Sequence, residues 1–161
     1  MVRSLRHRSL SAPSDLEVPV THTDDAAQIE TLLRGSRRIA VVGASADPSR
    51  PSNGVMRRLL VAGYDLVPVT PTYVEVLGIP TVPTLADVSG PIDVVDVFRR
   101  PEYLSQVARE AVAVRAGALW LQSGLRSADA RRIATDGGLT YVEDRCLAVE
   151  VAVRAITVRR G

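Results

Sequence analysis

The chain has 161 residues, of which 46% are hydrophobic and 24% are charged, enough for one globular domain with a sizeable core. It contains no apolar run as long as a membrane span, and its one cysteine, Cys146, excludes an internal disulfide and fits a cytoplasmic protein. It contains no lysine, which excludes a lysine-bearing phosphate loop, a Schiff base and a lysine general base.

The distribution of charge along the sequence does not indicate binding to nucleic acid. Between Ser36 and Glu150 arginines and acidic residues are equal in number, so the formal surplus of +2 lies in the flanks. Aromatic residues make up 4% of the chain and offer no stacking platform. We therefore expect no nucleic acid or membrane partner. Because both histidines, His7 and His22, precede the core, we also expect no metal site.

The N-terminal segment is rich in Ser, Pro and Arg and lacks apolar periodicity. This composition predicts a mobile tail over residues 1–23, followed by one domain over residues 24–158. Thr23 or Asp24 is expected to cap a helix that runs to about Leu33, and Gly35 is placed to end it.

From Arg38 onward, short apolar runs alternate with amphipathic stretches. The predicted strands are Arg38–Val42, Asp65–Val69, Ile92–Phe98, Ala118–Leu121 and Thr140–Val142. The predicted helices are Ser52–Ala62, Leu85–Val88, Pro101–Ala116, Ser127–Asp136 and Ala148–Val158, and Tyr73–Pro83 is a loop with room for a short strand. The alternation predicts an α/β fold, a single Rossmann-like domain with a mainly parallel sheet of about five strands and helices on both faces.

Ligands of such sheets bind beyond the carboxyl ends of the strands. The stretches that follow the predicted strands are Gly43–Asn53, Thr70–Gly78, Phe98–Arg100, Gln122–Gly124 and Asp144–Cys146. In the first stretch only Gly43 matches the three-glycine dinucleotide fingerprint. Ser52 and Asn53 stand at a predicted helix start, where free N–H groups and the helix dipole favour a phosphate. The alternative is that Ser52 merely caps the helix.

The end of the second strand argues against a nicotinamide cofactor. An NAD enzyme usually places an acidic residue there to hold the ribose, and an NADP enzyme places an arginine nearby. Here the strand runs into Thr70 and Pro71. An oxidoreductase that transfers hydride is therefore disfavoured.

The third strand is followed by Phe98, Arg99 and Arg100, and two guanidinium groups suit bidentate contacts to phosphate. The alternative is that one arginine bonds Glu102 or a carbonyl at a helix end. Phe98 could flank a flat ring or belong to the core.

The remaining stretches offer no catalytic group. Gln122, Ser123 and Gly124 supply polar donors and a flexible turn. Cys146 lacks a histidine base in the core, so we expect a buried, inert thiol. The acidic pairs Asp93/Asp96 and Glu143/Asp144 are expected to be ordinary solvated or capping groups.

Taken in order, six stretches resemble the small stand-alone CoA-binding domain proteins, which are related to the nucleotide-binding domain of the succinyl-CoA synthetase α subunit. They read Val-Val-Gly-Ala-Ser (41–45), Arg-Pro-Ser-Asn (50–53), Val-Pro-Val-Thr-Pro (67–71), Asp-Val-Phe-Arg-Arg-Pro (96–101), Leu-Gln-Ser-Gly (121–124) and Glu-Asp-Arg-Cys (143–146). The resemblance covers about residues 36–153.

The resemblance implies a Rossmann-like fold that holds coenzyme A across the strand ends. Its pyrophosphate would lie against Gly43, Ala44, Ser45, Ser52 and Asn53, and Thr70 and Pro71 would line the adenosine. Phe98, Arg99 and Arg100 would flank the adenine and a phosphate, and Gln122, Ser123 and Gly124 would contact the pantetheine arm. The phosphohistidine domain and the ATP-grasp partner of the ligases have no counterpart in this sequence.

The sequence thus leads to a hypothesis of a cytoplasmic protein that binds coenzyme A or acyl-CoA and has no catalytic site of its own. The alternatives are an NAD(P)-binding oxidoreductase and a nucleotide-sensing regulatory protein. The latter would use CoA occupancy as a signal, or Cys146 as the site of a mixed disulfide with the coenzyme. A homodimer is compatible with the sequence, which does not fix an interface.

Overall fold

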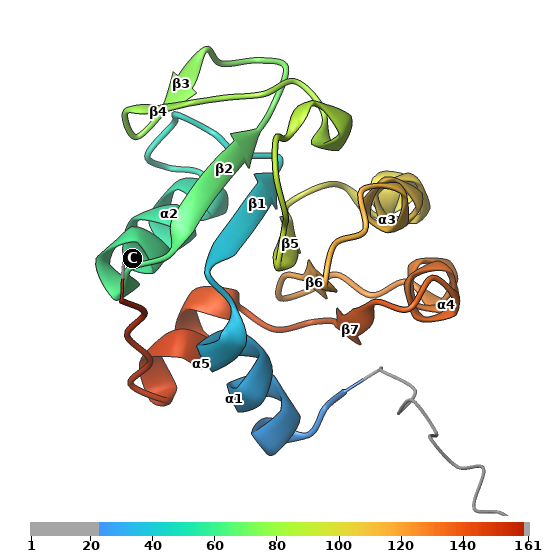
Figure 1. The fold of residues 1–161 in the computed structure, drawn as a ribbon. Helices are drawn as coiled ribbons and strands as arrows, with labels where there is room; N and C mark the ends of the chain where they lie inside the picture. The colour runs from blue at the N-terminus through green and yellow to red at the C-terminus, as the bar shows by residue number, and fades with distance from the viewer. Residues whose placement is uncertain (1–22, 160–161) are drawn as a thin grey trace, which may run out of the picture.

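The computed structural model describes residues 23–159, so the predicted mobile tail lies outside the described residues except for Thr23. Its centre is a parallel five-stranded sheet with the strand order β2-β1-β5-β6-β7 (Figure 1). The strands are β1 (Arg38–Val42), β2 (Asp65–Val69), β5 (Val94–Val97), β6 (Ala118–Leu121) and β7 (Thr140–Val142).

Helices cover both faces of the sheet, as Figure 1 shows. One face packs against α1 (Ala26–Gly35), α2 (Pro51–Ala62) and α5 (Leu147–Val153). The other face packs against α3 (Leu104–Ala113) and α4 (Ala128–Asp136). Each face has its own cluster of buried apolar residues, because neighbouring residues of a strand point to opposite sides. The predicted α/β Rossmann-like fold is confirmed.

A small hairpin extends the edge of the sheet beyond β2. It consists of β3 (Glu75–Val76) and β4 (Ile79–Pro80), which pair antiparallel. After the hairpin the chain returns beside β2, where Val82 forms a parallel bridge with Val69. Two backbone hydrogen bonds hold this contact, from the Thr70 N–H to the Val82 carbonyl and from the Val82 N–H to the Pro68 carbonyl. They cover part of an edge that would otherwise be open.

Several helix boundaries differ from those that the sequence pattern predicted. The first helix takes Asp25 as its N-cap, and not Thr23 or Asp24. The helix predicted over Pro101–Ala116 begins as a 3-10 turn (Pro101–Tyr103) and ends at Ala113, because Arg115 adopts a left-handed conformation before Gly117.

The last helix was predicted to extend to Val158, and α5 ends at Val153. Ala155 is left-handed there, and the Val158 N–H donates to the Ala62 carbonyl at 2.7 Å. The C-terminal segment therefore packs along the end of α2, and this contact outweighs the helix propensity of the sequence.

Gly43, directly after β1, occupies a backbone position that only glycine fits. Its φ is 83°, and a Cβ atom built there would lie 2.3 Å from the carbonyl oxygen of Phe98. That oxygen belongs to the backbone and cannot rotate away. Only glycine permits this approach between the chain segments that follow β1 and β5.

We expect Gly43→Ala to lower the free energy of unfolding by at least about 2 kcal/mol, since it combines a left-handed φ with a backbone clash. Gly54, in the first turns of α2, is the matched control, because an added Cβ atom meets nothing within 4 Å. Gly54→Ala should stabilise the protein by roughly 0.5–1 kcal/mol. Urea unfolding of both variants measures this. Equal effects of the two substitutions would contradict the steric argument.

Candidate functional site

The order in which the chain adds strands to the sheet reverses between β1 and β5. The chain passes from β1 outward to β2 on one side and then crosses to β5 on the other, so these neighbouring strands are followed by diverging connections. Ligands of open α/β sheets bind in the crevice at such a point. Here the Phe98 N–H donates to the Val42 carbonyl at 2.8 Å, and the Gly43 N–H donates to the Val69 carbonyl at 3.1 Å. The ends of three strands are thus tied together.

Hydrogen bonds between residues of the loop between β1 and α2 stabilise its conformation. Asn53 is 1% exposed, and its Nδ2 donates to the Ser45 carbonyl at 2.9 Å. The Ser45 hydroxyl accepts from the Asp47 N–H and donates to the Tyr73 hydroxyl. Ser52 is buried in the first turn. The side chains of Ser52 and Asn53 therefore shape the loop, and contact between either one and a phosphate stays a prediction.

No side chain caps the N-terminus of α2. Arg50 is the N-cap and makes no side-chain capping bond, and Pro51 is the first helical residue, so Ser52 is not the cap. The N-terminal N–H groups of a helix lack intrahelical partners and carry the positive end of the dipole. This end of α2 can therefore accept an anion through its backbone.

Thr70 and Pro71 follow β2 as predicted, but their environments differ. Thr70 is buried, and its hydroxyl accepts from the Thr72 N–H. Pro71 is exposed. Thr70 thus fixes the turn after β2, while Pro71 is the residue that a ligand could touch.

Two arginines beyond β5 have no carboxylate partner. None of the ion pairs formed within residues 23–159 involves Arg99 or Arg100, although Glu102 is close in sequence. The Arg99 guanidinium lies 4.3 Å from the centre of the Tyr103 ring, a cation–π contact. Arg100 is exposed. Phe98, between the sheet and this pair, is half-buried and packs against the core.

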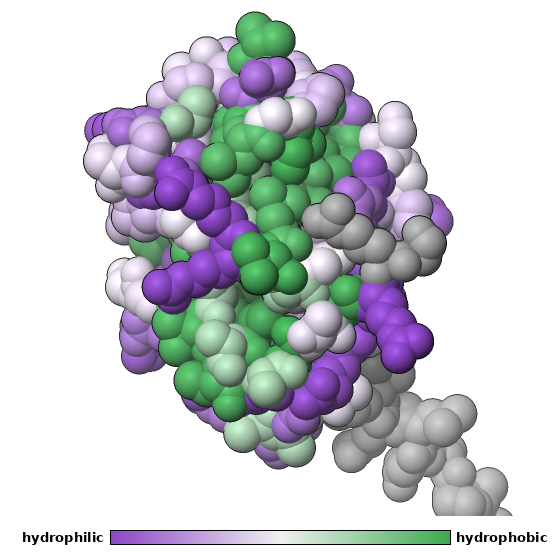
Figure 2. Space-filling model, turned by 90° about the vertical axis from the view of Figure 1, so that its left-hand side faces the viewer, coloured by the Kyte–Doolittle hydropathy of each residue, from purple (hydrophilic) through white to green (hydrophobic). Residues whose placement is uncertain are grey.

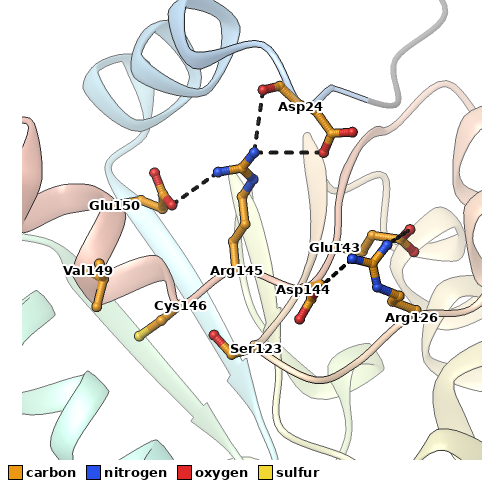
Figure 3. A pocket seen from close by; sticks show the side chains of 9 residues that line it. All are labelled: Asp24, Ser123, Arg126, Glu143, Asp144, Arg145, Cys146, Val149 and Glu150. Carbon is orange, nitrogen blue, oxygen red and sulfur yellow. Dashed lines mark hydrogen bonds and ion pairs between the residues drawn. The ribbon is translucent and has the colours of Figure 1, made fainter.

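Arg126, which follows β6, and Arg145, which follows β7, are in contrast paired with carboxylates. They surround a cavity of about 480 Å³ that Ser123, Asp144 and Cys146 also line (Figure 3). Arg126 contacts Asp144 at 2.6 Å. Arg145 reaches Glu150 at 3.3 Å and Asp24 at 3.8 Å, as the dashed lines in Figure 3 mark.

These pairs compensate most of the positive charge around the cavity. The Gly124 N–H and Arg126 lower the pKa of Asp144, which holds the negative charge in place. Cys146 is half-buried and borders the cavity, so the predicted buried thiol is wrong. An anionic ligand finds a better environment beyond β5 than here.

Asp96 lies inside β5, in register with Val41 and Trp120, and is 0% exposed. One carboxyl oxygen, Oδ1, accepts from the Gln122 Nε2 at 2.5 Å, and the other has no partner. Burial raises the pKa of Asp96 to about 7, against the opposing effect of hydrogen bonds from Gln122 and the Val97 N–H. The prediction that Asp96 is a solvated or capping group is wrong. One of the two N–H donors of the Gln122 amide, predicted as a donor for a ligand, is bound by Asp96 instead.

The sequence analysis misjudged Asp96 and assigned no role to three further residues of this region. Asp96 had a visible signal, a carboxylate within an apolar strand. Tyr73 and Tyr103 gave none, because only the fold brings them to Ser45 and Arg99. Trp120 is fully buried, and its indole N–H donates to the Arg145 carbonyl at 2.8 Å, which fixes the turn from β7 into α5.

Two classes of function receive no support from the described part of the chain. Within residues 23–159 no group of three or more His, Cys, Asp or Glu side chains could hold a metal ion. No helix of this region has the length and apolar character needed to cross a membrane.

Comparison with known proteins gives a consistent set of relatives. The family model described as CoA binding domain matches residues 37–152. The uncharacterized protein YneT of Bacillus subtilis strain 168 is 42% identical over 127 residues, which are 79% of this chain and 94% of that protein.

Two solved structures extend the comparison. A hypothetical protein from Pyrococcus horikoshii OT3 is 36% identical with a TM-score of 0.78, over 80% of this chain and 91% of that one. The apo form of the dinucleotide forming acetyl-coenzyme A synthetase 1 of Ca. Korarchaeum cryptofilum is 27% identical with a TM-score of 0.61, over 70% of this chain and 27% of that one.

The buried carboxyl of Asp96 should make stability depend on pH. Because its pKa is raised in the folded state, the folded protein holds a proton that the unfolded chain loses above about pH 4. The native protein therefore loses stability as the pH rises from about 4 to about 7. Asp96→Asn has no proton to lose, so its stability relative to the native protein should be about 2–3 kcal/mol higher at pH 8 than at pH 5.

Urea unfolding at both pH values tests this expectation. Asp136→Asn, at the exposed end of α4, serves as the control and should show no such pH dependence. A stability difference between Asp96→Asn and the native protein that does not change with pH would refute the raised pKa.

Proposed function

Because the chain belongs to the CoA-binding domain family, we propose that it binds coenzyme A or an acyl-CoA in the crevice where β1 and β5 end, without a catalytic site of its own. The observation that carries this proposal is the pair Arg99 and Arg100. Within residues 23–159 these arginines have no carboxylate partner. They directly follow Phe98, whose carbonyl oxygen lies against Gly43.

The pyrophosphate of the ligand would lie at the N-terminus of α2. Gly43 keeps the backbone free of a side chain at the mouth of the crevice, and Asn53 holds the loop through the Ser45 carbonyl. A rigid loop reduces the ordering cost of binding. Pro51 has no N–H, and the Asn53 N–H donates to the Arg50 carbonyl at 3.1 Å. The first turn of α2 would therefore hold the phosphate through its remaining N–H groups and the positive end of the helix dipole.

The arginine pair would hold the 3′-phosphate that distinguishes coenzyme A from NAD. A guanidinium group binds phosphate through parallel N–H donors. Arg99 is already oriented by Tyr103, so it loses less side-chain freedom on binding. Arg126 and Arg145 could serve less well, because each already contacts carboxylates.

Two features favour binding without chemistry. Residues 23–159 contain no histidine that could act as a general base on a hydroxyl or thiol. Asp96 titrates near neutral pH but is fully buried under the strand ends, where it cannot touch a substrate. The turn after β2 also lacks the acidic residue of NAD enzymes, since Thr70 and Pro71 stand there.

Calorimetric titration with coenzyme A and with 3′-dephospho-CoA tests the proposal. The native chain should prefer coenzyme A, and Arg99→Ala or Arg100→Ala should reduce that preference by roughly 10- to 100-fold, the effect of one lost charge-assisted bond. Arg109→Ala, on the exposed side of α3, is the matched control and should leave the preference unchanged. No binding at millimolar coenzyme A, or equal binding of NAD, would refute the function. An unchanged preference in both variants would refute the role of the arginines.

A further inference from the structure

Gln122 is a buried polar side chain with one atom left for a ligand. It is 6% exposed, and its Nε2 donates to Asp96. Its Oε1 is not among the buried atoms that lack a partner, and no N–H or O–H group within residues 23–159 donates to it. Oε1 is therefore the accessible end of the amide. Gln122 directly follows β6, which pairs with β5, and Arg99 lies in the segment after β5.

Asp96 determines which end of that amide faces outward. Above its pKa of about 7 the Asp96 carboxyl is ionised and only accepts hydrogen bonds, so its Oδ1 then pairs with the NH₂ group of Gln122 and the carbonyl oxygen faces away. In this arrangement Asp96 is fully buried and its second carboxyl oxygen has no hydrogen-bond partner, which is energetically unfavourable. A buried polar group in this state calls for an explanation beyond stability, because an apolar residue would cost less there.

We propose that Asp96 is a positioning residue that fixes Gln122 with Oε1 as an acceptor for an N–H donor of the ligand. The inference rests on the proposed function, in which this donor is an amide N–H of the pantetheine arm of coenzyme A. It also refines the expectation from the sequence, which treated Gln122 only as a donor, since its carbonyl oxygen is an acceptor. The arrangement favours ligands whose arm carries amide groups over ligands that end at the diphosphate.

The test uses two ligands and a double-mutant cycle. The ligands are coenzyme A and 3′-phosphoadenosine 5′-diphosphate, which lacks the pantetheine arm. The variants are Gln122→Met, which removes the acceptor, Asp96→Leu, which removes the positioning group, and the double variant. Gln106→Met, an exposed glutamine of α3, is the matched control. Thermal melting of each variant verifies that it is folded.

We expect each single variant to weaken coenzyme A roughly 5- to 20-fold, the effect of one hydrogen bond, and to leave the truncated ligand unchanged. The double variant should be no weaker than Gln122→Met, because Asp96 acts only through Gln122. Gln106→Met should bind both ligands as the native chain does.

Three results would overturn the inference. Equal weakening of both ligands would make Asp96 and Gln122 merely structural, and additive losses in the double variant would mean that Asp96 does not act through Gln122. In both cases the proposed function would stand. Failure of the native chain to bind either ligand would overturn the proposed function as well.

Discussion

The close approach of Gly43 to the Phe98 carbonyl is the constraint on which the candidate site depends. It joins the segments that leave β1 and β5, the two strands between which the connections diverge. Any side chain at position 43 would push these segments apart, and the hydrogen bond from the Phe98 N–H to the Val42 carbonyl would lengthen. The start of α2 and the Arg99–Arg100 pair are placed relative to one another through this contact.

Charge compensation separates the two parts of the strand-end surface. Around the cavity beyond β7, Arg126 and Arg145 are neutralised by neighbouring carboxylates, and these contacts stabilise the turn into α5. Beyond β5, the positive charge of Arg99 and Arg100 is left uncompensated within the described residues. We propose the second region for the phosphates of the ligand, and Gln122 directly follows the neighbouring strand β6.

The sequence predicted the sheet better than the site. The bounds of β1, β2, β6 and β7 were predicted exactly as observed, because short apolar runs between glycines and prolines leave little choice. The ends of α3 and α5 could not be predicted, since backbone contacts such as that of Val158 with Ala62 decide them. Local pattern likewise could not tell that Asn53 bonds the Ser45 carbonyl or that Asp96 pairs with Gln122, because the fold brings these partners together.

The position of the bound ligand tests the central claim most directly. A second cavity, of about 610 Å³, lies at the opposite end of the strands near Arg37, Gly63 and Asp65. Figure 2 shows hydrophobic surface on the side of the molecule where α2 and the hairpin lie. The measurement is an amide chemical-shift titration of the isotope-labelled protein with coenzyme A. The account predicts shifts at Gly43–Ser45, at Phe98–Arg100 and in the first turn of α2. Shifts confined to the second cavity, or none at millimolar ligand, would contradict it.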